Sequence, residues 1–133
     1  MADQLPIRVL SVDDHPLLRE GIATIITSQP DMELVAQAPN GTEAIREYRK
    51  HLPDVTLMDL RLPDLSGIDT MIAIRAEFPD ARIIMLTTFE GDVEVQRALE
   101  AGASGYLTKN MPPRELAQAI RQVHKGEGGC LER

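Results

Sequence analysis

Charged and hydroxyl-bearing side chains stand at the ends of four short apolar runs in this sequence. The clearest case is Asp59, which ends the run Val55-Thr56-Leu57-Met58 and precedes a turn at Pro63. A short apolar run bounded by turn residues is typical of a strand buried on both faces. In open parallel sheets, ligands bind where such strands end. The other runs end in functional groups of the same kind: Asp13 and Asp14 after 7–12, Thr87 and Thr88 at the end of 82–87, and Lys109 after 104–108.

Together these groups favour phosphoryl transfer onto a carboxylate. Three converging carboxylates repel one another, so a cation is expected among Asp13, Asp14 and Asp59. Carboxylate and water oxygens suit Mg²⁺, whereas Zn²⁺ prefers His or Cys. Lys109 adds a positive charge and Thr87 a hydroxyl donor. A hard metal ion, an ammonium group, a hydroxyl and a nucleophilic carboxylate are the parts that forming an acyl phosphate requires.

The elements that must position these groups alternate between strand and helix. Strands are predicted at 7–12, 33–38, 55–59, 82–87 and 104–108, and helices are predicted to begin at Pro16, Thr42, Ser66 (as N-cap), Gly91 and Pro112. Pro-Asp pairs at 30–31, 53–54 and 79–80 end three of these helices. Strict alternation with short connections predicts a parallel sheet covered by helices on both faces.

The second strand is expected at an edge of the sheet, because it ends in Ala38-Pro39 without a charged group. That position belongs to the strand order 2-1-3-4-5. We therefore predict an α/β, flavodoxin-like (βα)5 three-layer sandwich with a five-stranded parallel sheet in that order.

Composition narrows the possible functions. The 133 residues are enough for one domain with a sizeable core, and aromatic residues make up only 3 %, so the core must be aliphatic. A net charge of −7 argues against nucleic-acid binding by this chain alone. The apolar runs are too short to span a membrane, the start lacks a signal-peptide pattern, and the single Cys130 cannot form an internal disulfide. These features are compatible with a cytoplasmic location.

The sequence resembles the receiver domain of two-component response regulators over about residues 6–126. Four segments carry the resemblance: Val-Asp-Asp-His-Pro at 12–16, Leu-Met-Asp-Leu-Arg-Leu-Pro at 57–63, Leu-Thr-Thr-Phe at 86–89 and Gly-Ala-Ser-Gly-Tyr-Leu-Thr-Lys at 102–109. The first and last are most similar to the NarL/FixJ (LuxR-type) subfamily. The resemblance implies a receiver domain over residues 1–126, with 127–133 as the start of a linker or a short tail.

The resemblance also implies a role for each group at the edge of the sheet. Asp59 would accept the phosphoryl group from a sensor histidine kinase in a reaction that needs Mg²⁺. Asp14 and Asp59 would bind the ion directly, Asp13 through water, and Arg61 through its backbone carbonyl. The resemblance implies a signalling module rather than an enzyme, one that would catalyse its own phosphotransfer and dephosphorylation.

Further roles concern the bound phosphoryl group and the response to it. Lys109, Thr87 and Thr88 would bind the phosphoryl oxygens, and Thr87 would act with Tyr106 as a switch. Arg61 and Phe89 would control access to the group. Phosphorylation would promote homodimer formation, and DNA would be bound only through a C-terminal helix-turn-helix domain that this chain does not include. The output would then be transcription.

Two features depart from the family pattern. Many receivers have a cis-proline directly after the lysine, whereas here Asn110 occupies that position and prolines follow at 112 and 113. The chain also ends soon after the last predicted helix, so it is expected to be either a fragment or a single-domain regulator.

Three alternative functions agree less well with the residues of the site. A haloacid-dehalogenase-type aspartyl phosphatase would need an acid two residues beyond the nucleophile, where this chain has Arg61. A flavodoxin would need a phosphate-binding loop after the first strand, where Asp13-Asp14 would repel phosphate. A degenerate receiver would act only as a dimerisation or interaction module, and the complete set of functional groups argues against it. His15 is expected to be a first-turn residue near the rim of the site.

Overall fold

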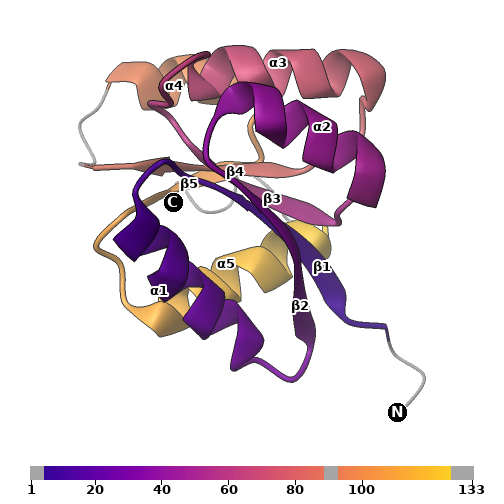
Figure 1. The fold of residues 1–133 in the computed structure, drawn as a ribbon, viewed down its shortest axis with the longest axis vertical. Helices are drawn as coiled ribbons and strands as arrows, with labels where there is room; N and C mark the ends of the chain where they lie inside the picture. The colour runs from indigo at the N-terminus through magenta and orange to yellow at the C-terminus, as the bar shows by residue number, and fades with distance from the viewer. Residues whose placement is uncertain (1–4, 89–92, 127–133) are drawn as a thin grey trace.

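The computed structural model describes residues 5–88 and 93–126 (Figure 1). Ten elements alternate along the chain in the predicted order: β1 (Ile7–Val12), α1 (Pro16–Thr27), β2 (Met32–Ala38), α2 (Gly41–His51), β3 (Val55–Asp59), α3 (Gly67–Glu77), β4 (Ile83–Thr87), α4 (Val93–Glu100), β5 (Gly105–Thr108) and α5 (Pro113–His124). The predicted start of α4 at Gly91 lies outside the described residues.

The sheet is parallel throughout, with strand order β2-β1-β3-β4-β5. The predicted flavodoxin-like topology is confirmed, and β2 lies at an edge as expected. The register aligns the carboxyl ends of the inner strands: Val12 pairs with Met58, so Asp13 and Asp59 follow side by side. Thr87 pairs with Thr108, so Lys109 emerges at the same edge.

Helices cover both faces of the sheet. Figure 1 shows α1 and α5 on one face and α2, α3 and α4 on the other. Residues along each inner strand alternate between the two layers: Val9 and Leu57 pack toward α1 and α5, whereas Leu10 and Met58 pack toward α2 and α3. Because both faces are buried, the inner strands are continuous apolar runs rather than alternating ones. None of the helices in the described residues is long and apolar enough to cross a bilayer.

Local signals fix where the helices begin. Pro16 is the first residue of α1, and the side chain of Ser66 caps α3 by accepting a hydrogen bond from the Asp69 N–H. Asn40 caps α2 in the same way, so this helix begins at Gly41, one residue before its predicted start. In α5, Pro112 is the N-cap residue and Pro113 the first helical residue, because a proline at the first position loses no helical hydrogen bond.

The connection from β3 to α3 passes very close to the backbone at the end of β3. The Gly67 N–H donates to the Leu60 carbonyl at 2.8 Å. A Cβ at Gly67 would lie 2.1 Å from the Asp59 carbonyl oxygen and 2.9 Å from the Leu60 Cα. Both contacts are with backbone, so no side-chain rotation relieves them. Only glycine allows α3 to begin this close to Asp59.

Gly67→Ala is therefore expected to lower the free energy of unfolding by about 1–3 kcal/mol, the usual cost of overpacking. Gly21→Ala is the matched control: Gly21 lies in α1, and a Cβ there meets nothing within 4 Å. The control is expected to stabilise the protein by about 0.5–1 kcal/mol, since alanine has the higher helix propensity. Urea denaturation measures both, and equal stabilities of the two variants would contradict the close approach at Gly67.

Candidate functional site

Asp59 is buried at the end of β3 and has two hydrogen-bond donors. Its side chain is 3 % exposed. Oδ2 accepts a hydrogen bond from Lys109 Nζ at 2.7 Å, and Oδ1 accepts one from the Arg61 N–H at 3.1 Å. Burial raises the pKa of Asp59 above its ordinary value, while the hydrogen bond from Lys109 acts in the opposite direction. Asp59 is thus a nucleophile candidate held between an ammonium group and a backbone N–H.

Asp13 lies beside Asp59 and is completely buried. Its Oδ1 accepts a hydrogen bond from the His15 N–H at 2.8 Å. Its Oδ2 has no hydrogen-bond partner among the described residues. Lys109 Nζ is 3.4 Å from this oxygen, a distance for charge attraction without an aligned hydrogen bond. A buried carboxylate oxygen with no donor is in position to bind a cation or a cation-bound water.

A cluster of four side chains meets the requirements for a divalent metal. Asp13, Asp14, His15 and Asp59 each offer one ligand atom, and these atoms all lie within 4.8 Å of one another. Asp14 is more accessible, with 36 % of its side chain exposed. Three carboxylates, one of them carrying the unpaired Asp13 Oδ2, are the oxygen donors that Mg²⁺ favours. The residues therefore fit a magnesium ion.

A cavity of about 110 Å³ opens directly onto Asp59. The other residues around it come from the loop after β3 and from the carboxyl ends of β1, β4 and β5 with their following loops, namely Leu60, Arg61, His15, Leu86, Thr87, Thr88 and Lys109. Thr87 is buried and Thr88 is exposed. The structure thus brings the predicted carboxylates, the lysine, both threonines and Arg61 to one edge of the sheet.

A family model of the response regulator receiver domain matches residues 9–121. This chain belongs to the response regulator receiver family. Among curated proteins, the receiver domain is similar to the response regulator VraR of Staphylococcus aureus, with 38 % identity over 123 residues. That match covers 92 % of this chain and 59 % of VraR, so the chain spans about 59 % of the length of this relative.

Two solved structures resemble this receiver domain closely. A LuxR-family two-component response regulator from Aurantimonas sp. SI85-9A1 is 42 % identical with a TM-score of 0.88, covering 92 % of this chain and 88 % of that one. The signal receiver domain of NarL from Mycobacterium tuberculosis is 32 % identical with a TM-score of 0.87, covering 92 % and 98 %. These likenesses agree with the NarL/FixJ subfamily expected from the sequence.

One predicted residue lies away from the cavity, and another falls outside the described residues. Tyr106 is half-buried in β5, pairs with Met85 of β4, and packs against the core on the α2–α4 side of the sheet. It does not line the Asp59 cavity. Phe89, predicted to control access to the phosphoryl group, lies outside the described residues.

His15 takes a larger part in the site than its sequence position suggested. It is the N-cap residue of α1 rather than a first-turn residue, and its side chain is 63 % exposed. Its ring Nδ1 nevertheless lies 2.9 Å from Asp13 Oδ1 and 3.2 Å from Asp14 Oδ1. Direct adjacency to Asp13-Asp14 was the one sequence signal for this contact.

Asp64 fixes the loop after Asp59 in a way that no local pattern indicated. Its carboxylate accepts hydrogen bonds from the N–H groups of Gly41, Thr42 and Leu65 and from the Thr42 hydroxyl, at 2.6–3.0 Å. These bonds, the hydroxyl first, hold the pKa of Asp64 well below its usual range. Asp64 thereby ties the β3–α3 loop to the N-terminus of α2, where a negative charge is favourable.

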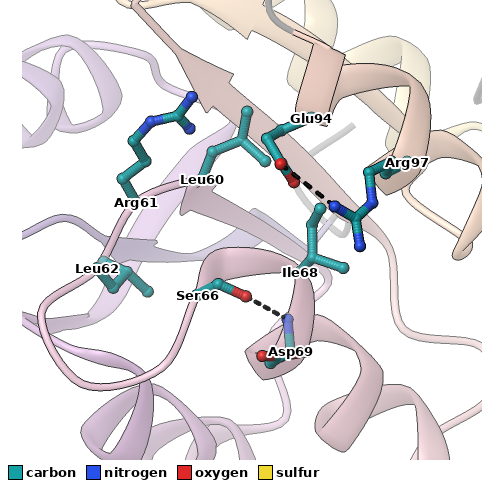
Figure 2. Close-up of a pocket in the computed structure, with 8 residues that line it drawn as sticks. All are labelled: Leu60, Arg61, Leu62, Ser66, Ile68, Asp69, Glu94 and Arg97. Atoms are coloured by element: carbon teal, nitrogen blue, oxygen red, sulfur yellow. Dashed lines mark hydrogen bonds and ion pairs between the residues drawn. The ribbon is translucent and has the colours of Figure 1, made fainter.

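A second, larger hollow of about 470 Å³ adjoins the site on the α4 side. Figure 2 shows Leu60 and Ile68 among the residues that line it, together with an ion pair between Glu94 and Arg97 of α4. Asp13, Asp14 and Asp59 are not among its lining residues. Leu60 and Arg61 line both hollows, so the loop after Asp59 connects the reactive edge to the surface of α4.

Asp59→Asn is expected to stabilise the metal-free protein at pH 7. A raised folded-state pKa means that Asp59 contributes stability below its unfolded pKa and loses this contribution as pH rises through the folded pKa. The amide removes the cost of burying the charge, while Lys109 keeps Asp13 as a partner. The stability difference between variant and wild type should therefore shrink as pH falls toward 4.

Urea denaturation in a chelator at several pH values measures this difference. Asp80→Asn, which replaces an exposed acid, is the control and should follow wild type throughout. A variant that is less stable than wild type at pH 7, or equally offset at every pH, would show that burial of the Asp59 charge is not a net cost.

Proposed function

We propose that this receiver domain accepts a phosphoryl group on Asp59 from a sensor histidine kinase, in a Mg²⁺-dependent reaction, and so controls an output. The observation that carries the proposal is the burial of Asp59 in hydrogen-bond contact with Lys109, beside Asp13 and Asp14. A cationic partner and a buried carboxylate at one strand end are the parts that nucleophilic phosphotransfer needs.

In the transfer, a carboxylate oxygen of Asp59 forms a bond to phosphorus as the phosphorus–nitrogen bond of the donor phosphohistidine breaks. The imidazole leaves with the electron pair of that bond. The Arg61 N–H, already 3.1 Å from Asp59 Oδ1, orients the carboxylate. Lys109 Nζ, 2.7 Å from Oδ2, is close enough to bind an oxygen of the transferred phosphoryl group and stabilise its negative charge. Thr87 and Thr88 line the same cavity.

Receiver domains bind Mg²⁺ at an acidic pocket, and this chain offers a matching cluster. Asp14 and Asp59 would hold the ion directly, Asp13 through water, and Arg61 through its backbone carbonyl. When bound, Mg²⁺ neutralises negative charge on the carboxylates and the phosphoryl oxygens.

The response to phosphorylation involves β4, β5 and α4. Thr87 would donate a hydrogen bond to the phosphoryl group, which would draw the end of β4 toward Asp59. Tyr106 lies on the neighbouring strand, half-buried, and would turn inward as this space opens. The Leu60–Arg61 segment lines the hollow beside α4. A change at Asp59 would therefore reach the α4 side of the sheet through this segment as well as through Tyr106. A few kcal/mol of differential contact is enough to move such a two-state equilibrium.

The output of the whole protein is proposed by analogy with its longer relatives. The chain covers 59 % of VraR, and its structural relatives include LuxR-family regulators. Residues 1–126 would form the receiver, 127–133 would begin a linker, and a C-terminal helix-turn-helix domain would bind DNA as the receiver dimerises. The domain itself would be a signalling module that assists its own phosphorylation and dephosphorylation, with Phe89 and Arg61 controlling access of water.

Incubation with a small phosphodonor and Mg²⁺ is expected to add the mass of one phosphoryl group to wild type. Asp59→Asn should gain nothing because the nucleophile is absent, and Asp14→Ala should gain nothing because the metal site is incomplete. Asp80→Asn, an exposed acid outside the site, should match wild type. Intact-mass spectrometry reads all four. Phosphorylation of Asp59→Asn would refute the assignment, and an unmodified wild type would favour the degenerate-receiver alternative.

Thr87→Ala is expected to be phosphorylated but to switch poorly. In wild type, the phosphoryl analogue beryllofluoride should change the sedimentation coefficient or the NMR environment of Tyr106, because the Thr87 hydroxyl links the two. Without that hydroxyl, both changes should be largely lost. A Thr87→Ala protein that responds as fully as wild type would exclude this coupling while leaving Asp59 as phosphoacceptor.

A further inference from the structure

We propose that His15 is a nitrogen ligand to the divalent metal at the acidic cluster, so that the site holds imidazole-favouring ions such as Co²⁺ more tightly than carboxylates alone would. The inference rests on the metal site of the proposed function and adds to it a donor of different chemistry. Among the described residues, the cluster that contains His15 is the one group of at least three such side chains within metal-binding distance.

The spacing of the ligand atoms supports a shared ion. Nδ1 of His15 lies 2.9 Å from Asp13 Oδ1, 3.2 Å from Asp14 Oδ1 and 3.9 Å from Asp59 Oδ2. Around an octahedral ion with bonds of about 2.1 Å, neighbouring ligands lie about 3 Å apart and opposite ligands about 4.2 Å apart. The distance to Asp14 Oδ1 matches neighbouring positions and the distance to Asp59 Oδ2 lies between the two values, while the contact with Asp13 Oδ1 is a hydrogen bond. A nitrogen at these distances from Asp14 and Asp59, the two carboxylates proposed to hold the ion directly, has the geometry of a further ligand.

The backbone places the ring in this position. The His15 N–H donates to Asp13 Oδ1 at 2.8 Å, which turns the residue toward the site. Pro16 follows and disfavours helical backbone at His15, whose φ of −94° and ψ of 109° are extended. The helix therefore begins after His15, and the ring stays on the side of the carboxylates.

Asp13 Oδ2 is a further sign that the cluster is short of positive charge. This oxygen is completely buried and has no hydrogen-bond partner among the described residues; Lys109 Nζ lies 3.4 Å away but donates its hydrogen bond to Asp59. A buried carboxylate oxygen without a hydrogen-bond donor is costly, and one ammonium group shared between two carboxylates leaves negative charge for a further cation to neutralise. The open side of the His15 ring leaves a route for an ion from solvent, and Asp14 at the same opening supplies the more accessible oxygen.

The chemistry predicts a selective effect. Imidazole binds Co²⁺, Ni²⁺ and Zn²⁺ readily, whereas Mg²⁺ prefers oxygen and keeps its water. In the metal-free protein, Nδ1 is at hydrogen-bond distance from Asp13 Oδ1. In the complex the same nitrogen would present its lone pair to the ion, with the ring proton on Nε2. Loss of His15 should thus weaken Co²⁺ binding much more than Mg²⁺ binding.

The test compares Co²⁺ and Mg²⁺ affinity by calorimetry in wild type, His15→Ala and His15→Gln, with His124→Ala as control. His124 lies exposed at the end of α5, away from the cluster. Every protein should carry Cys130→Ser, which removes the one thiol of the chain as a competing ligand. Paramagnetic shifts of the His15 ring protons on adding Co²⁺, followed by NMR, report the contact without any phosphorylation.

Loss even of a group that supports a metal ligand costs roughly tenfold or more in affinity. We therefore expect both His15 variants to bind Co²⁺ at least about tenfold more weakly, with Mg²⁺ affinity changed by less than that and the His124 control unchanged. Equal Co²⁺ affinity in wild type and His15→Ala, no Co²⁺ binding, or no shift of the His15 ring would overturn the proposal. Wild-type phosphorylation with Mg²⁺ is read separately, so failure of the proposed function remains distinguishable from failure of the His15 ligand.

Discussion

Two carboxylates, Asp13 and Asp59, are buried side by side at the carboxyl edge of the sheet, and their mutual repulsion constrains the whole site. Two like charges about 4 Å apart repel by about 4 kcal/mol at an effective dielectric constant of 20. Lys109 offsets part of this repulsion, since its ammonium group lies 2.7 Å from one carboxylate and 3.4 Å from the other. Burial still raises the pKa of Asp59. Because Lys109 neutralises only part of the negative charge, the site favours binding of a further cation.

The sheet and its connections are arranged to sustain that unfavourable charge. Helices cover both faces of the continuous apolar strands, and the parallel pairing holds the strand ends in fixed register. Gly67 lets α3 start against the backbone of Asp59, and Asp64 ties the same loop to α2 across 22 residues of sequence. The loop is therefore anchored at both ends, which holds the Arg61 N–H against Asp59. Loops that carry function are commonly positioned in this way by a rigid scaffold.

The open side of the site differs from its buried side in the groups that it offers. Inside lie Asp13, Asp59 and Lys109; at the opening lie Asp14 and the His15 ring, which are exposed to solvent. The same edge continues through Leu60 and Arg61 to the hollow beside α4 (Figure 2). A change at Asp59 thus has a short physical path to the surface of α4.

The amino-acid sequence by itself determined the element order, the parallel topology and most members of the site. Apolar runs that end in Asp13, Asp59, Thr87 or Lys109 are local signals, and parallel strands bring their carboxyl ends to one edge. Ser66 and Pro16 also act locally, because caps and first-turn prolines depend on neighbouring residues alone.

The tertiary structure decided the contacts between segments. The cap that Asp64 places on α2, the close approach at Gly67 and the unpaired oxygen of Asp13 depend on distances between strands and loops that no local pattern encodes. Adjacency placed His15 near two carboxylates, but the ring distance to Asp59 follows from strand register. Spacing along a chain fixes which strand end carries a group, whereas the three-dimensional packing fixes which atoms of those groups meet.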